Sequence, residues 1–206
     1  MAAFVHCNFR SNILCMSVDV SVLLPDNERS RLFLENKQEP VKYKTLYLLH
    51  GFTGDYMSYL RTSNIERYAD EYQIMVVMPS IYNSAYTDMK YGLDYFTYLS
   101  KELMHFIELT FPASQKREER FVAGMSMGGY GAYKFGLSCP EKFCAIGGVA
   151  GSYHAEYRYQ GKVSTVSTLC EGLYGDPPQI VPEVHDVFTL LKQLKEEGKE
   201  IPRLYT

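Results

Sequence analysis

Short apolar runs alternate with amphipathic stretches along most of the chain. Residues 16–25 alternate apolar and polar side chains, which is the pattern of a strand with one buried face. Residues 45–51 and 74–79 are instead nearly continuous apolar runs, as expected for central parallel strands that are covered on both faces. We predict strands at all three places.

Helical periodicity appears between and after these runs. Residues 64–72 read as a helix with Ser63 or Asn64 as its N-cap. From 94 to 111, apolar residues recur at helical spacing, and Asp94 stands where an N-cap residue is expected. We predict one amphipathic helix in each segment.

The second half of the chain continues the alternation. Strands are predicted over residues 120–124 and 144–151, and helices over 127–137 and 184–198. A further strand is predicted to begin within 202–206. Strands that alternate with helices in this way indicate an α/β fold, with a mostly parallel sheet and helices on both faces.

One stretch interrupts the alternation. Residues 152–182 are rich in glycine and proline, and we predict a loop-rich segment there. Long loops inside a compact domain are usually functional or contain small elements of their own, and we expect this segment to lie near the active site. Because no repeat or linker is evident, residues 1–206 are predicted to form a single domain.

Composition and charge exclude several classes of protein. The net charge is -3 and no basic run occurs, which argues against a nucleic-acid partner. No stretch approaches the roughly 20 apolar residues of a membrane span, and no signal-peptide pattern opens the chain. The five cysteines are irregularly spaced, so we expect free thiols and a cytoplasmic location. No zinc or nucleotide motif is present, so we predict neither a metal nor a cofactor.

The sequence Gly124-Met-Ser126-Met-Gly128 has the form G-x-S-x-G. The bare pattern is weak, but here a predicted strand precedes it and a predicted helix follows it, which is the context of a nucleophilic serine on a sharp turn. Side chains at Gly124 and Gly128 would collide with the helix and the neighbouring strand. The helix N-terminus also favours an anion at this point. We therefore predict that Ser126 is a nucleophile.

A second motif precedes the serine strand. The predicted strand over 45–51 ends in His50-Gly51, where hydrolases of this architecture place part of the oxyanion hole. We predict that the backbone N–H groups of Phe52 and Met127 hold the oxyanion, with Gly51 as the alternative to Phe52. We interpret His50 as a structural residue, because the base comes last in the chain order of this architecture. The two motifs together indicate an α/β-hydrolase fold.

At this point the sequence resembles the esterase D family, through "YLLHGFTGD", "NIERYADEY" and "GMSMGGYGAYK". That family includes tributyrin-type esterases, S-formylglutathione hydrolases and some feruloyl esterases. The first 25 residues resemble the bacterial tributyrin esterase branch. The resemblance covers essentially the whole chain and implies a cytoplasmic carboxylesterase that acts on small-molecule esters with short acyl groups and needs no cofactor.

The acid and base of a catalytic triad are not evident in the chain. Only His154 and His185 follow the serine. Asp176 and His185 have the right order, but both precede the next strand, so we interpret His185 as a helix-end or surface residue. His154 follows a strand and is a candidate pocket residue. In the family, the acid and histidine come after the strand that begins at Arg203, so we predict a C-terminally truncated hydrolase that lacks the strand and helix carrying them.

Several properties stay open at this level. An acyl pocket is predicted from residues 52–59, 82–91 and 152–182. The substrate is a short-chain ester or, alternatively, a thioester of the S-formylglutathione type. The absent acid and base leave a third alternative, a non-catalytic binding or assembly protein with the same fold. Exposed core surface and a free sheet edge would favour association, so a homo-oligomer is also open.

Overall fold

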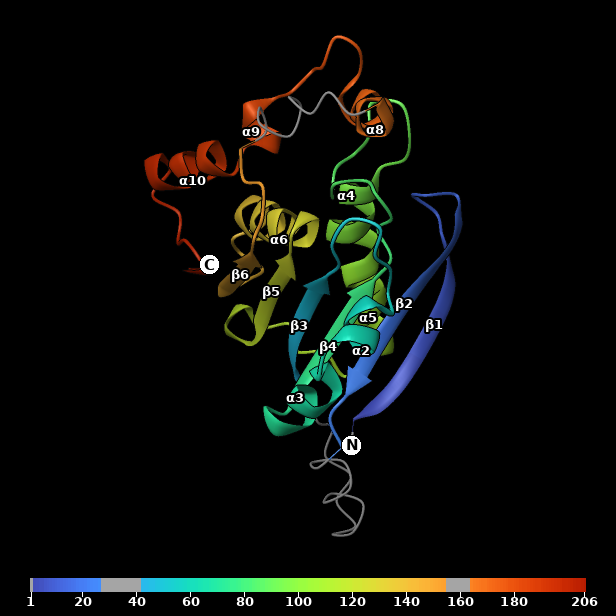
Figure 1. Cartoon of the computed structure of the whole chain (residues 1–206). Coiled ribbons are helices and arrows are strands. Elements are labelled where there is room, and N and C mark those ends of the chain that lie inside the picture. The colour runs from blue at the N-terminus through green and yellow to red at the C-terminus, as the bar shows by residue number, and fades with distance from the viewer. Residues whose placement is uncertain (1, 27–41, 155–163) are drawn as a thin grey trace.

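The computed structural model describes residues 2–26, 42–154 and 164–206 (Figure 1). A seven-stranded sheet runs through these residues in the order β1-β2-β4-β3-β5-β6-β7. Its strands are β1 (Ala3–Ser11), β2 (Met16–Leu24), β3 (Lys44–Leu49), β4 (Ile74–Pro79), β5 (Arg120–Met125), β6 (Ala145–Val149) and β7 (Arg203–Tyr205).

Most of the sheet is parallel. β3 lies between β4 and β5 and pairs parallel with both, and β5-β6 and β6-β7 are parallel as well. Only β1-β2 and β2-β4 are antiparallel. The predicted mostly parallel α/β sheet is therefore confirmed. The carboxyl ends of β3, β5 and β6 meet at one edge of the sheet, and this edge carries the serine turn.

The helices follow the strands. They are α2 (Ser58–Thr62), α3 (Ile65–Glu71), α4 (Tyr95–Thr97), the π-helical η1 (Tyr98–Leu103), α5 (Met104–Thr110), the 3₁₀ turn η2 (Arg117–Glu119), α6 (Met127–Ser138), α8 (Ser164–Tyr174), α9 (Pro182–His185) and α10 (Val187–Glu196).

Both faces of the sheet carry helices (Figure 1). The main core joins the valines of β2 and Tyr47 of β3 to the helices α5, α6 and α10. The opposite face has a smaller core of Leu23, Leu48 and Val76, packed by α2 and α3. Because neighbouring residues of a strand point to opposite faces, the continuous apolar runs of β3 and β4 supply both cores.

Part of the segment predicted to be rich in loops, residues 152–182, is helical. The segment contains α8, an eleven-residue helix, and the first residue of α9. Residues 155–163 lie outside the described residues. The single helix predicted over 184–198 is two helices, because the chain turns at Asp186. The carboxylate of Asp186 caps α10 by accepting a hydrogen bond from the N–H of Thr189.

The helix predicted over 94–111 is real but not uniform. Its middle is the π-helical η1, flanked by α4 and α5. Asp94 and Asn64 occupy the N-cap positions of α4 and α3, yet neither side chain makes a capping hydrogen bond. The sequence pattern located these two helices correctly, but the capping interaction predicted for each is absent.

A groove of about 420 Å³ lies on the face of the sheet opposite α6. Its walls include Leu48, Met125, Val149 and Tyr205, so it is apolar. Formation of a homo-oligomer stays a prediction. In the described part of the chain, no helix combines the length and apolar character that a membrane span requires.

Candidate active site

Ser126 lies on a sharp turn between β5 and α6. Its backbone has φ 56° and ψ -120°, in the left-handed half of backbone space that non-glycine residues seldom occupy. The turn is held by the Ser126 N–H, which donates to the Val149 carbonyl at 2.8 Å, and by the Ser126 carbonyl, which accepts from the Tyr130 N–H at 3.1 Å. Ser126 is thereby fixed as the N-cap residue of α6, where the helix dipole favours negative charge.

The two glycines of the motif allow a very close approach of backbone segments. A Cβ atom on Gly124 would lie 2.4 Å from the Gly128 carbonyl oxygen. A Cβ atom on Gly128 would lie 1.9 Å from the Leu49 carbonyl oxygen at the end of β3. Neither distance is compatible with a side chain, so the turn needs glycine at both positions.

The His-Gly loop lies directly beside the serine. A Cβ atom on Gly51 would be 3.6 Å from the Cβ atom of Ser126. The buried ring of His50 is engaged at both nitrogens: Nδ1 is 2.7 Å from the Gly51 carbonyl oxygen, and Nε2 accepts from the Ile81 N–H at 3.0 Å. Burial lowers the pKa of His50, so the ring is neutral and holds the loop.

Two further hydrogen bonds fix this loop to the segment that follows β4. The Tyr86 hydroxyl donates to the His50 carbonyl at 2.7 Å, in a buried position. The Thr53 N–H donates to the side-chain oxygen of Asn83 at 2.8 Å. The loop that carries Phe52 is thus held on both sides, which limits how far its backbone can move. Asn83 and Tyr86 carry no sequence signal that would have identified this role.

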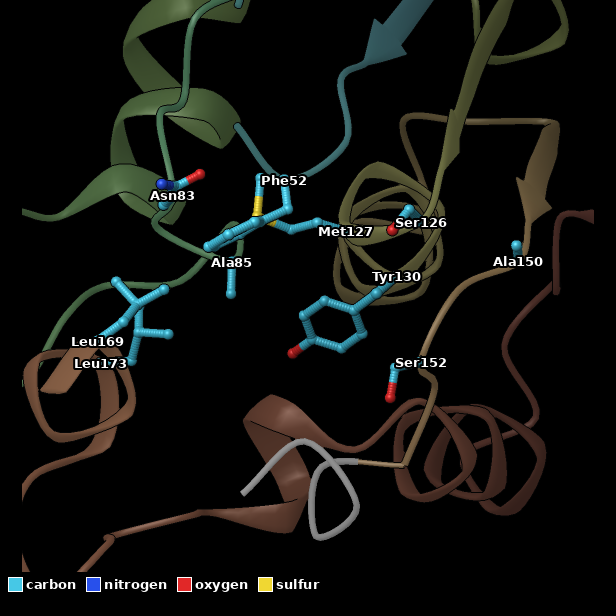
Figure 2. Close-up of a pocket in the computed structure, with 10 residues that line it drawn as sticks. All are labelled: Phe52, Asn83, Ala85, Ser126, Met127, Tyr130, Ala150, Ser152, Leu169 and Leu173. Atoms are coloured by element: carbon cyan, nitrogen blue, oxygen red, sulfur yellow. The ribbon is translucent and has the colours of Figure 1, made fainter. Parts of the chain in front are cut away.

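Backbone donors without a hydrogen-bond partner in the described part of the chain lie in the segments beside the serine. Among the described residues, the N–H groups of Phe52 and Met127 make no hydrogen bond to another protein group. The Gly51 N–H is also unused there, so it remains the alternative to Phe52. Phe52, Met127 and Ser126 line one cavity (Figure 2). Free N–H groups beside a nucleophile are what an oxyanion hole requires.

Backbone strain is concentrated around this cavity. Apart from Cys15 and Gln73, every described non-glycine residue with positive φ lies in one of the four segments that follow the strands β3, β4, β5 and β6: Thr53, Tyr82, Ala85, Tyr86, Ser126 and Ala150. Such conformations cost about 1–3 kcal/mol each and persist where the surrounding structure enforces them. Their grouping is typical of a functional site.

The cavity has a volume of about 230 Å³ and is mainly apolar (Figure 2). Each of the three segments predicted to form an acyl pocket contributes to its wall. No sequence pattern identified Tyr130 and Ala150 as wall residues. The lining residues are Phe52, Asn83, Ala85, Ser126, Met127, Tyr130, Ala150, Ser152, Leu169 and Leu173.

His185 is committed to structural contacts. Its ring is buried against Tyr174, with ring centroids 5.2 Å apart, and its Nδ1 accepts from the Val181 N–H at 3.0 Å. Its carbonyl accepts from the Tyr130 hydroxyl at 2.9 Å. His185 is therefore a helix-end residue as predicted, but a buried one.

His154 lies against the start of α10. Its ring stacks on Phe188 at 4.4 Å, and its Nδ1 is 3.6 Å from a carboxylate oxygen of Asp186. Within the described residues, the Ser126 hydroxyl makes no hydrogen bond to either histidine. Asp176 is exposed beyond α8. The structure places the serine beside the backbone N–H groups that were predicted to hold the oxyanion, and it assigns no described residue as the base.

Comparisons with known proteins agree with this geometry. Residues 11–157 match the family model "Esterase". An acetyl esterase of Caldicellulosiruptor saccharolyticus is 31% identical over 219 residues, which cover 98% of this chain and 78% of the relative.

Two solved structures from Staphylococcus aureus are similar as well. The substrate-bound fluorophosphonate-binding serine hydrolase F has a TM-score of 0.88 at 34% identity, covering 98% of this chain and 77% of that one. An S-formylglutathione hydrolase has a TM-score of 0.83 at 33% identity, covering 99% and 78%. The chain belongs to the Esterase family and is a serine ester hydrolase of the α/β-hydrolase fold.

Proposed function

We propose that this protein is a carboxylesterase for short-chain acyl esters and that Ser126 is its nucleophile. The observation that carries the proposal is the meeting of three features in one cavity: the strained serine turn, the N-terminus of α6 and the unused N–H groups of Phe52 and Met127. The acetyl esterase relative supports a small acyl group.

The reaction follows from this arrangement. The Ser126 oxygen bonds to the ester carbonyl carbon while its proton passes to a base, and the carbonyl oxygen becomes an anion. The Phe52 and Met127 N–H groups stabilise that anion, which is commonly the largest single catalytic contribution. The bond to the alcohol then breaks and the alcohol leaves with a proton. Water hydrolyses the remaining acyl-serine. No described residue is assigned as the base.

A fluorophosphonate probe tests the nucleophile directly, because it reacts with activated serines. The chain offers a matched control in Ser152, which lines the same cavity but lies off the strained turn. Labelling, measured by intact mass, is expected in the wild type and in Ser152→Ala and absent in Ser126→Ala. Equal labelling of wild type and Ser126→Ala would disprove the assignment. A wild type that binds esters but never labels would favour a non-catalytic role.

Thioester hydrolysis is the second candidate, because the S-formylglutathione hydrolase of Staphylococcus aureus is 33% identical to this chain. A thioester needs the same nucleophile and oxyanion hole, so the site chemistry does not separate the two candidates. The two candidates are separated by comparing kcat/KM for S-formylglutathione with kcat/KM for simple esters of equal acyl length. A preference for the thioester of tenfold or more would favour this second candidate.

A further inference from the structure

The cavity extends from Ser126 to an apolar end (Figure 2). That end is formed by Ala85, on the segment that holds the His-Gly loop, and by Leu169 and Leu173 of α8 (Figure 2). The two leucines are four residues apart and so lie on one face of the helix. Ala85 and Leu173 are buried. The region farthest from the serine is therefore a hydrophobic wall.

This wall is attached to the body of the protein. The N–H groups of Lys90 and Tyr91 donate to the carbonyls of Leu173 and Gly172 at 3.0 and 2.9 Å. Leu173 also belongs to a small core with Ala85 and Tyr174, against which Met89 and Met127 pack. Leu173 is therefore held in place through both its side chain and its backbone.

The volume indicates the size of the group that fits. At about 230 Å³, the cavity exceeds the roughly 150 Å³ that holds a benzene molecule in a dry protein interior, and it is smaller than the usual 300–1,000 Å³ of drug-sized sites. An acetyl group would leave most of it unfilled. A straight chain of about four to six carbons would fill it.

The positions of buried and exposed residues indicate which half of the ester enters. The acyl group stays bonded to Ser126 after the alcohol has left, so a buried pocket suits it, whereas the alcohol needs a route to solvent. On the side of the serine away from α8, Val149 and Ala150 are exposed. The apolar end beside the buried Leu173 therefore suits the acyl chain.

We propose that the cavity is an acyl pocket for straight chains of four to six carbons and that Leu173 is the residue that limits chain length. The inference rests on the proposed function of Ser126. It adds a substrate class longer than acetyl and a specificity-determining residue on α8.

Isomeric esters test this proposal. Methyl hexanoate and pentyl acetate have the same molecular formula. Methyl hexanoate carries its long chain on the acyl side, and pentyl acetate carries it on the alcohol side. Dissociation constants for methyl esters and for alkyl acetates are measured by ligand-observed NMR on Ser126→Ala, which should not turn them over. Affinity should rise about fourfold per methylene along the methyl esters up to hexanoate, then fall. Alkyl acetates should show no such optimum.

Variants of the wall locate the limit. In the Ser126→Ala background, Leu173→Ala should move the optimum to longer acyl chains and Leu173→Phe to shorter ones. Leu169→Ala, at a less buried position, repeats the first test if Leu173→Ala does not fold. Leu109→Ala, on the exposed surface of α5, is the control and should leave the optimum unchanged.

The failure of this inference is distinguishable from failure of the proposed function. Affinity that is independent of acyl length, that follows the alcohol chain instead, or that is unchanged in all wall variants would overturn the acyl pocket. These outcomes concern binding to a variant without the Ser126 hydroxyl. Labelling of Ser126 by the fluorophosphonate probe is a separate measurement on the wild type, and it can succeed or fail independently.

Discussion

Replacing Gly128 by alanine should severely destabilise the protein. The added Cβ atom would lie 1.9 Å from the carbonyl oxygen and 2.6 Å from the carbonyl carbon of Leu49. To reach even 3.0 Å from that oxygen, α6 and β3 must separate by about 1.1 Å. β3 is a central strand that pairs on both sides, and the first turn of α6 is fixed by the serine turn. Little relaxation is therefore available.

The substitution should lower the free energy of unfolding by about 3 kcal/mol or more. This is at or above the upper end of the range for overpacked cores, because the added atom clashes with the backbone. For a domain of this size, about 3 kcal/mol lowers the midpoint of thermal unfolding by roughly 6–12 °C. Thermal melts of the purified wild type and variant, followed by circular dichroism, measure this shift of the midpoint. Fluorophosphonate labelling at 25 °C should slow in parallel, because relieving the clash displaces Ser126.

Gly172→Ala is the matched control. Its Cβ atom would have an ordinary contact of 3.6 Å with Met89, and the position lies inside α8 at negative φ. The exchange should be neutral or stabilise by up to about 1 kcal/mol, since alanine favours helices. If Gly128→Ala lowered the midpoint by less than about 3 °C, or if Gly172→Ala lowered it as much, the steric argument would be refuted.

Three further changes test the contacts around the serine. Tyr86→Phe removes the donor to the buried His50 carbonyl and should cost about 1–3 kcal/mol in urea unfolding; an unchanged midpoint would contradict this. Burial lowers the pKa of His50 in the folded protein from its ordinary 6.5. As the pH falls below 6.5, His50 is therefore protonated in the unfolded state and stays neutral in the folded state. The free energy of unfolding should decrease in this pH range. His50→Gln, which keeps an acceptor for the Ile81 N–H, should remove that part of the slope between pH 7.5 and 5.5, and parallel curves would refute the assignment. Asp186→Ala deletes the cap that accepts from the Thr189 N–H and should cost about 1 kcal/mol, whereas Asp186→Asn should lose much less; equal losses would argue against capping.

The central strands and the serine turn were predictable because local sequence determines them. β3 and β4 are buried on both faces, so their apolar runs are unbroken. The motif around Ser126 could be recognised because the close approach to Leu49 demands glycine at a fixed spacing. Such requirements leave a pattern in the sequence itself.

Other parts of the site depend on the tertiary structure. Asn83 and Leu173 are ordinary residues in sequence, and they acquire roles only when the fold places them beside Phe52 and the cavity. α8 was missed because glycines and prolines surround it. The edge strand β1 received no explicit prediction, although its residues alternate between half-buried and exposed as an edge strand should.

The antiparallel hairpin at the sheet edge has a consequence for the order of folding. β1 and β2 pair from Ser11 opposite Met16, five residues apart, whereas β3 and β5 pair from Thr45 opposite Arg120. By loop-closure entropy, joining partners 75 residues apart costs about 2.4 kcal/mol more than joining partners five apart. Hairpins form in about 1–10 μs, so we expect the edge of the sheet to form early and the pairing that builds the serine site to form late. The hairpin is separated from the serine strand β5 by β4 and β3, and it would then serve as the template on which the active site is assembled last.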